Sequence, residues 1–344
     1  MSSQILQAKA RLRPQLGEWA YDNCAHAWPK LKQRLLLPQP RSEFVIRLNK
    51  LCSDQDFAKL FEFPSLPCVL PQACMQGWTL LSQRMANFDF LRANFAREKI
   101  ECGKDAVTGL PVHVKLGEFL SYQATQQDRS PMYIFDSKMP LFRSEYTTSK
   151  VFGEDYLDVI FSKRPPFRWE LLGPERSGSS LHVDPLFTSA WNTLLLGRKL
   201  WVLLSPNTQV DGFGPEVRAI DFFEHHLTKT ITKLRPENRL YYFVQEPGET
   251  VFVPSGWHHA VLNLEDTIAL TQNWVGNANL NAVWRSIRME RKKLAWEWKI
   301  ALKRSNPLVF HRIEALDLED GFDLQVEITT EREQRQLDKQ RKLK

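Results

Sequence analysis

The first side chains that could bind a metal ion lie in the segment GPERSGSSLHVDP, at residues 173 to 185. It contains His182 and Asp184, two positions apart. In a β-strand, residues i and i+2 point to the same face, so an imidazole and a carboxylate would project together from this segment. Such a pair could bind a metal ion, or it could be a hydrogen-bonded pair at the end of a strand.

A third metal ligand has to come from another strand, and four histidines downstream could supply it. His225 and His226 lie in DFFEHHLTK, which has a helical pattern, so we expect both at the surface. His258 and His259 open a strand after PSGW, and alternation allows one of the two to face inward. Both faces of that strand carry apolar residues, so periodicity leaves the choice between them open.

Two histidines and one carboxylate are a ligand set that suits non-haem ferrous iron. They occupy one face of an octahedron and leave three positions open for a bidentate co-substrate and O₂. The sequence contains no GxGxxG and no GxxxxGK[ST] motif, so it does not favour a site that cradles nucleotide phosphates.

The elements that must position these residues are short strands. Between residues 168 and 275 the strand patterns are RWELLG, SSLHVDP, KLWVLLS, TVFVPS, HHAVLNL and TIALTQNWV, separated by turn residues. Upstream, PCVLP, LPVHVKL and PMYIFDS also have a β-like pattern. Many short strands around an interior predict a mainly β fold, a double-sheet jelly roll. The lack of regular β-α alternation argues against a doubly wound nucleotide-binding fold.

Helical patterns flank this β region on both sides. We expect an N-terminal helical region over residues 1–60, with a helix that begins after Ser42, and a β domain over residues 61–276. A C-terminal helical region is expected over residues 277–325, before a charged tail over 326–344 that is a solvated helix or disordered.

The composition is that of a soluble globular protein, with 43% hydrophobic and 25% charged residues. The 5 cysteines form no CxxC pair, which argues against a secreted disulfide framework. No run of about 18 apolar residues is present, so we expect no membrane span and an intracellular protein.

The net charge of +6 is concentrated at residues 284–304, which hold 8 basic and 2 acidic residues. This segment predicts a surface for an acidic partner such as RNA, or else a solvated helix face.

The order of these motifs resembles the JmjC family of 2-oxoglutarate oxygenases. HVD is followed by the lysine of GRKLW and then by PSGWHHAVLNL and TIALTQNWV, and further similar motifs cover roughly residues 5 to 320. The resemblance implies a cupin-like double-stranded β-helix with helical extensions at both ends, Fe(II) as the metal, 2-oxoglutarate as co-substrate and O₂ as oxidant. It also implies that His259, directly before the AVLNL run, is the third ligand beside His182 and Asp184.

The same resemblance implies contacts to the co-substrate or near the metal for six further residues: Lys199, Tyr133, Thr271, Asn192, Ser179 and Asn273. Lys199 would pair with the distal carboxylate of 2-oxoglutarate, and the tyrosine and threonine would donate hydroxyl groups to it. The alternative for Lys199 is an ordinary lysine at a strand edge. For the two asparagines and the serine it is a polar group satisfied by the backbone.

Within the family, the chain resembles members that hydroxylate lysyl side chains or demethylate arginine. We therefore expect a protein lysyl hydroxylase acting on basic segments of RNA-processing, translation or chromatin proteins. The second expectation is an N-methyl demethylase of methylated arginine or lysine, and the third is a non-catalytic barrel that binds RNA or protein through its basic C-terminal helix. The resemblance also implies a homodimer formed through the C-terminal helices, and we expect the nucleus rather than the cytoplasm.

Overall fold

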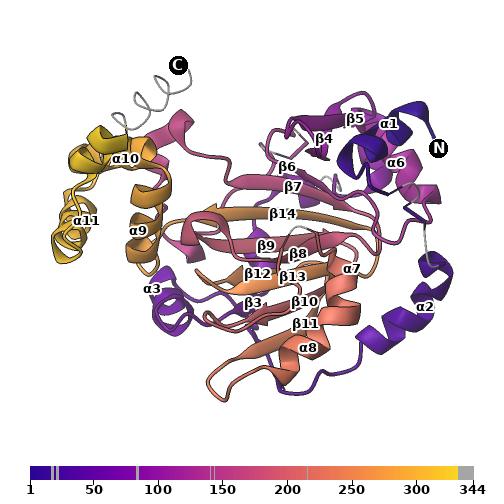
Figure 1. Cartoon of the computed structure of the whole chain (residues 1–344), viewed down its shortest axis with the longest axis horizontal. Coiled ribbons are helices and arrows are strands. Elements are labelled where there is room, and N and C mark those ends of the chain that lie inside the picture. The colour runs from indigo at the N-terminus through magenta and orange to yellow at the C-terminus, as the bar shows by residue number, and fades with distance from the viewer. Residues whose placement is uncertain are drawn as a thin grey trace, which may run out of the picture.

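The computed structural model describes residues 1–16, 19–20, 23–82, 85–139, 141–142, 144–214 and 216–331. Most of the predicted charged tail, residues 332–344, lies outside the described residues. Within the described ranges, the centre of the molecule is a five-stranded sheet and a seven-stranded sheet, with a separate two-stranded sheet near the N-terminus (Figure 1). No described helix has the length and apolar character needed to cross a lipid bilayer.

The five-stranded sheet carries most of the residues that the sequence singles out. Its strands, in spatial order, are β1 (Ser42–Glu43), β11 (Leu240–Gln245), β10 (Lys199–Leu204), β13 (His258–Asn263) and β8 (Gly178–His182). β13 runs antiparallel to both of its neighbours, with Leu203 opposite His259 on one side and His182 opposite His259 on the other.

The seven-stranded sheet faces the five-stranded one. Its strands, in spatial order, are β2 (Ile46–Arg47), β3 (Cys68–Leu70), β12 (Thr250–Val253), β9 (Ser189–Leu196), β14 (Thr267–Trp274), β7 (Arg168–Gly173) and β6 (Ile134–Asp136). The two-stranded sheet pairs β4 (Lys99–Lys104) with β5 (Pro111–Lys115).

The space between the two large sheets is filled by alternate side chains of both. Trp201 and Leu203 from the five-stranded sheet pack in one cluster with Ala190, Val251 and Val253 from the seven-stranded sheet. Alternation explains this, because every second residue of a strand faces the partner sheet. The predicted jelly roll is therefore confirmed, as two open sheets whose edge strands, among the described residues, are β1 and β8 in one and β2 and β6 in the other.

Helices cover the outer face of the five-stranded sheet. They are α2 (Cys24–Leu35), α7 (Ala219–Asp221), η6 (Phe222–His226) and α8 (Leu227–Thr232). Leu200 and Val202 of β10 and Leu262 of β13 form one buried cluster with these helices. The residues between them in sequence face the other sheet, so β10 and β13 are buried on both sides.

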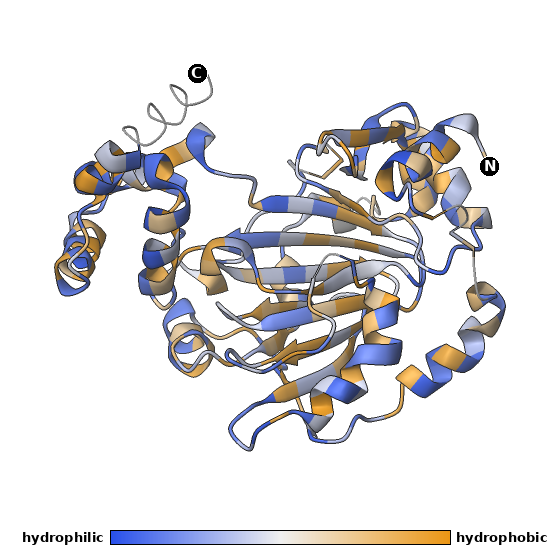
Figure 2. Ribbon diagram, viewed as in Figure 1, coloured by the Kyte–Doolittle hydropathy of each residue, from blue (hydrophilic) through white to orange (hydrophobic). Residues whose placement is uncertain are grey.

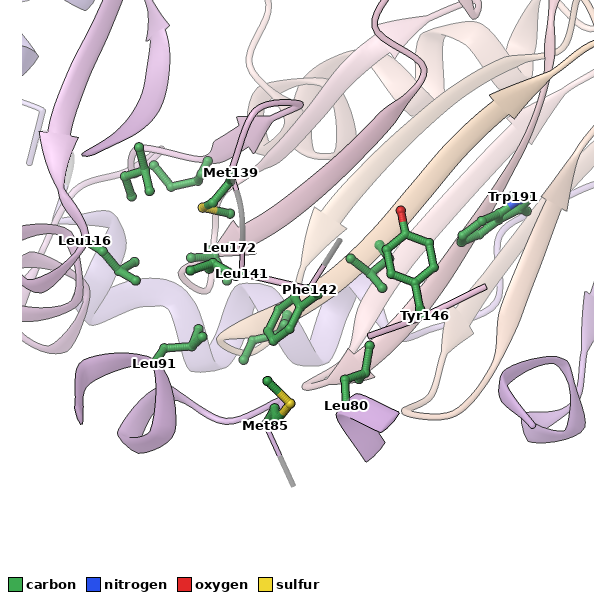
Figure 3. Close-up of a cluster of buried hydrophobic side chains, with 14 of the residues drawn as sticks. Leu80, Met85, Leu91, Leu116, Met139, Leu141, Phe142, Tyr146, Leu172 and Trp191 are labelled. Carbon is green, nitrogen blue, oxygen red and sulfur yellow. The ribbon is translucent and has the colours of Figure 1, made fainter. Parts of the chain in front are cut away.

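The N-terminal elements cover the outer face of the seven-stranded sheet. They include α1 (Ser3–Leu12), α5 (Phe88–Phe95), α6 (Leu116–Thr125) and the β4–β5 pair. Figure 3 shows the core beneath them, which includes Leu91, Leu116 and Leu172 of β7, and in which the Tyr146 ring lies beside Trp191 of β9 with 6.3 Å between ring centroids. Shorter elements complete the chain: α3 (Asp54–Phe57), η1 (Ala58–Glu62), η2 (Gln72–Met75), α4 (Thr79–Ser82), η3 (Lys150–Phe152), η4 (Asp158–Lys163) and η5 (Pro185–Phe187).

The C-terminal helices stack beside the sheets at the end opposite the N-terminal elements (Figure 1). They are α9 (Leu280–Glu290), α10 (Lys292–Ser305) and α11 (Pro307–Glu319). Each carries apolar and polar bands (Figure 2), and the apolar ones form a core that includes Trp284, Trp298 and Ile313. Pro307 begins α11 at a position where its missing N–H costs no helical hydrogen bond.

One secondary-structure prediction is wrong. The helix expected after Ser42 is absent, because residues 42–43 and 46–47 are short strands that pair in parallel with β11 and β3. The helix of this region begins later, at α3, where the Ser53 side chain accepts a hydrogen bond from the Asp56 amide at 3.1 Å. Pairing with strands distant in sequence has overridden the local apolar spacing.

Candidate metal centre and co-substrate pocket

His182, Asp184 and His259 converge at one end of the space between the sheets. His182 ends β8 and lies opposite His259 on β13, with 4.1 Å between the ring centroids. Asp184 follows two residues later, and its Oδ1 lies 4.0 Å from His259 Nε2. One ligand atom from each of the three residues lies within 4.8 Å of the other two. This spacing is compatible with a single metal ion between them.

Backbone carbonyl groups set the orientation of both imidazoles. His182 Nδ1 lies 2.7 Å from the carbonyl oxygen of Ser180, and His259 Nδ1 lies 3.2 Å from that of Trp257. A carbonyl oxygen only accepts, so each Nδ1 must be the protonated nitrogen. Each Nε2 then keeps a free lone pair, which is the form that binds a metal.

The electrostatics of the three residues also fit a cation. Burial lowers the pKa of His259 well below its ordinary value, and the neighbouring His182 adds to this effect, so the ring stays neutral. Burial raises the pKa of Asp184, while His182 and Asn273 oppose the rise. Asp184 Oδ2 is buried and has no hydrogen-bond partner among the described residues. A bound divalent cation would satisfy this oxygen and favour the ionised carboxylate.

A β-bulge brings Ser179 onto the same face as His182. The register pairs His182 with His259 and Ser179 with Val261, so three steps along β8 match two steps along β13. Strict alternation would place residues 179 and 182 on opposite faces, and the extra residue of the bulge removes this difference. Leu181, inside the bulge, turns outward into the cluster beneath the helices.

All nine residues that the sequence analysis assigns to the site line one cavity. They are Tyr133, Ser179, His182, Asp184, Asn192, Lys199, His259, Thr271 and Asn273. Six further residues line the cavity without having been predicted from the sequence: Phe135, Leu171, Ala190, Trp201, Val253 and Val261. Trp201 is the most informative of these, because its ring stacks on His259 at 6.1 Å and its Nε1 donates to Gln245 at 2.8 Å. Its position two residues after Lys199 was a signal for the shared face.

Lys199 is the lysine that lines this cavity. Its side chain is fully buried, and Nζ donates to the hydroxyl of Tyr133 at 3.1 Å. Among the described residues, no carboxylate pairs with it. Burial lowers the pKa of Lys199 to about 7. A buried ammonium group is stabilised by a bound anion, so this end of the cavity suits a carboxylate.

The remaining polar residues differ in what they can offer a ligand. Thr271 Oγ1 donates to the carbonyl oxygen of Trp191 at 2.7 Å, so it must rotate to donate elsewhere. Asn192 Oδ1 is buried without a partner among the described residues. Asn273 Nδ2 donates to Thr188 Oγ1 at 2.8 Å, which connects it to the turn after Asp184.

The other histidines considered as ligands lie elsewhere. His258 does not line the cavity, and its ring meets the ring of Phe213 edge-on at 5.7 Å. His226 Nδ1 lies 2.6 Å from Asp211 Oδ1, and His225 is exposed. The structure thus brings His259 to His182 and Asp184, and the helical pattern expected around residues 225–226 is confirmed.

The basic segment at residues 284–304 is partly neutralised by the elements that follow it. Acidic side chains beyond residue 310 pair with four of its eight basic residues: Arg285 with Asp320 at 2.7 Å, Arg288 with Asp317 at 2.6 Å, Lys292 with Glu327 at 2.8 Å and Lys299 with Asp317 at 3.0 Å. The other four are exposed: Arg291, Lys293, Lys303 and Arg304. The surface charge is therefore smaller than the sequence suggests.

Comparison with known proteins agrees with this geometry. Residues 169–274 match the model of the JmjC domain, described as a hydroxylase. The chain is 33% identical to the bifunctional arginine demethylase and lysyl-hydroxylase psr-1 of Caenorhabditis briggsae, over 91% of this chain and 80% of that protein. It is 32% identical to the arginine-specific demethylase JMJ22 of Arabidopsis thaliana, over 80% of this chain and 57% of that protein.

A third relative is the human 2-oxoglutarate and iron-dependent oxygenase JMJD4, which is 29% identical over 68% of this chain and 62% of its own length. The matched JmjC residues run from β7 to the end of β14 and include the three converging side chains and Lys199. The chain belongs to the JmjC family of iron- and 2-oxoglutarate-dependent oxygenases.

Proposed function

We propose that this chain is a protein oxygenase that hydroxylates lysyl side chains in basic segments of other proteins. The observation that carries the proposal is the cavity itself. At one end it has His182, Asp184 and His259 with their ligand atoms within 4.8 Å, and it also contains a fully buried lysine without a carboxylate partner. The first feature fits a ferrous ion and the second fits the distal carboxylate of 2-oxoglutarate.

The two imidazoles and the carboxylate would hold Fe(II) through His182 Nε2, His259 Nε2 and Asp184. Each histidine presents Nε2 because its Nδ1 is engaged by a backbone carbonyl. Both histidines lie on paired strands, so the sheet limits their movement. When bound, iron and 2-oxoglutarate together supply the O₂-dependent oxidation of an unactivated C–H bond.

The residues at the far end of the cavity would orient the co-substrate. Lys199 would bind its distal carboxylate, and the Tyr133 hydroxyl, which burial keeps neutral by raising its pKa, could donate to the same group. Thr271 could do so after rotation, and Asn192 and Ser179 would contribute polar contacts nearer the metal. The apolar members of the lining keep water away and strengthen these charge interactions.

The substrate class is proposed from the relatives, whose names include lysyl hydroxylation and arginine demethylation. Hydroxylation of a lysyl carbon yields a stable alcohol. Hydroxylation of an N-methyl group yields a carbinolamine, which releases formaldehyde and the demethylated amine. The second candidate function is therefore N-demethylation of methylated arginine or lysine, performed by the same site.

Intact-peptide mass spectrometry tests these two functions together. Basic peptides containing lysine, and the same peptides with methylated arginine or lysine, are incubated with the full chain, Fe(II), 2-oxoglutarate and air. A gain of one oxygen, with matching succinate, supports the hydroxylase, and the loss of one methylene supports the demethylase. The Asp184→Ala variant is the control. Peptide oxidation that persists in this variant would contradict the assigned metal centre.

Finer features of the assembly are proposals as well. We propose a homodimer through the C-terminal helices, supported by exposed apolar side chains there, including Trp296 (38% exposed) and Ile300 (39% exposed). A monomeric mass at micromolar concentration would contradict it.

We propose RNA binding through the exposed basic residues of α10, which a filter-binding assay would test. We also propose a nuclear location, which cell fractionation would test. We also propose the division at residues 60/61, 276/277 and 325/326, which limited proteolysis would test.

A further inference from the structure

Asp184 is held differently from the two histidines. The β8–β13 ladder includes His182 and His259 but ends before Asp184, which has extended backbone and leads directly into the turn η5. No strand pairing therefore fixes the carboxylate. Its position depends on the turn that follows it and on a hydrogen bond from the Asn273 side chain.

That turn has an unusual backbone conformation. Leu186 and Phe187 are consecutive residues with left-handed backbone, at φ 57° and φ 56°. Bulky side chains rarely adopt this conformation, and it persists where surrounding contacts hold it. The strain lies within three residues of Asp184.

The contacts that hold the turn come from two directions. The Ser255 hydroxyl donates to the carbonyl oxygen of Phe187 at 2.6 Å, from the loop that precedes β13. On the other side, the Leu186 side chain is 9% exposed and belongs to the core of the C-terminal helices, where α9 contacts η5. Val283 and Ile287 of α9 lie in that same core.

We propose that Leu186 is a positioning residue for Asp184, and that α9 holds the carboxylate at the metal site by packing against this side chain. The inference rests on the proposed function, in which Asp184 binds the metal. It assigns to the C-terminal helices a role in the metal centre besides any role in association between chains. Loss of the contact between the Leu186 side chain and α9 should let the turn relax, and the Asp184 carboxylate should move away from the two imidazoles.

Glycine at position 186 separates the contribution of the Leu186 side chain from that of the left-handed backbone conformation. Glycine adopts left-handed backbone without strain, so Leu186→Gly keeps the conformation accessible while it deletes the side chain. Leu186→Met keeps most of the apolar contact, because methionine fills irregular space well. Leu302→Ala is the matched control, because Leu302 is a fully buried leucine of the same core that lies on α10.

The test is a titration of each metal-free full-length variant with Mn(II), followed by the electron paramagnetic resonance signal of unbound Mn(II). We expect Leu186→Gly and Leu186→Ala to bind Mn(II) about tenfold or more weakly, as for the loss of other groups that orient metal ligands. Leu186→Met and Leu302→Ala should stay within about threefold of wild type. Thermal melts of the same samples show whether each variant is folded.

Two results would overturn the inference: wild-type affinity in Leu186→Gly, or an equal loss in Leu302→Ala. Asp184→Ala is titrated in parallel. If Asp184→Ala binds Mn(II) like wild type, the proposed metal centre itself is wrong. If Asp184→Ala weakens Mn(II) binding but Leu186→Gly does not, the metal centre stands and only the role of Leu186 is wrong.

Hydrogen exchange on the metal-free wild-type chain needs no variant and covers the case in which Leu186→Gly does not fold. The Thr188 amide donates to the carbonyl oxygen of Pro185 at 3.2 Å, so its protection reports on the turn. If α9 holds the turn, this amide should exchange no faster than the amides in the middle of α9. Rapid exchange at Thr188 while α9 stays protected would also contradict the proposal.

Discussion

Replacement of Lys199 by methionine should make the protein more stable and at the same time weaken its binding of 2-oxoglutarate. Burial lowers the pKa of this lysine from 10.5 to about 7. At pH 7.5, such a difference between folded and unfolded chains corresponds to about 4 kcal/mol against folding. Methionine removes this cost but leaves the Tyr133 hydroxyl without its donor, a loss of about 1–3 kcal/mol. The net expectation is a gain of about 1–3 kcal/mol in the free energy of unfolding.

The co-substrate affinity should change in the opposite direction. Removing one partner of a buried charge pair costs about 2–5 kcal/mol, which is a loss in affinity of about 30-fold or more. Urea unfolding of the metal-free chain measures the first effect, and anaerobic calorimetry of 2-oxoglutarate binding to the Mn(II)-loaded chain measures the second. Leu200→Met is the matched control, because Leu200 faces the helices on the other side of β10 and should leave the affinity unchanged.

The dependence on pH provides a second check of the same reasoning. The penalty for burying the Lys199 charge is complete below pH 7, where folded and unfolded chains both hold the proton. Between about pH 7 and 10.5 the unfolded chain binds more protons, so stability rises with pH in this window. Co-substrate affinity should fall as the pH rises above about 7, because the ammonium must be reformed on binding. Lys199→Met should lose both dependences. A destabilised variant, or one whose affinity stays within threefold of wild type, would refute the assignment.

Three further substitutions test the surroundings of the site and the scaffold. Gly173→Ala should lower the free energy of unfolding by about 1–3 kcal/mol and weaken co-substrate binding in calorimetry, because a Cβ there would lie 2.1 Å from Asn263 Nδ2 beside the cavity. An unchanged urea midpoint would contradict this. Lys9→Met should cost about 3–5 kcal/mol in urea unfolding, because it leaves the buried Asp128 carboxylate without its 2.8 Å partner. Asn306→Ala, at the N-cap of α11, should lower the free energy of unfolding by about 0.5–2 kcal/mol, with no change in metal affinity.

Several strands could be predicted because their signals are local. The segment RWELLG is β7 with the predicted bounds, and its partner TIALTQNW is β14. The strands β4, β9 and β11 escaped prediction. β9 is buried on both faces over most of its length, so it lacks the alternation of apolar and polar residues that marks a half-buried strand. The two-residue strands β1 and β2 exist through pairing with strands far away in the chain, which no local pattern reveals.

For the site, too, local residue patterns were predictable and contacts between distant segments were not. The HxD spacing and the family motifs were sufficient to name nine of the residues that line the cavity, since order along the chain and residue type carry that information. Neither Trp201 nor Leu186 was assigned a role, because stacking on His259 and packing against α9 are contacts between distant segments. The inward position of Ser179 depends on a bulge that alternation does not predict.

Residue types and their order along the chain therefore specified the chemistry: which side chains can bind a metal, which lysine can receive a carboxylate, and that short strands must present them. Tertiary structure decided the geometry. It placed His259 on the inner face of β13, beside His182 on the neighbouring strand β8, whereas helices cover the outer face of β13. It also buried Lys199 at a place where, among the described residues, no carboxylate forms a salt bridge with it. Periodicity describes one strand at a time, whereas these outcomes depend on which surfaces meet across the molecule.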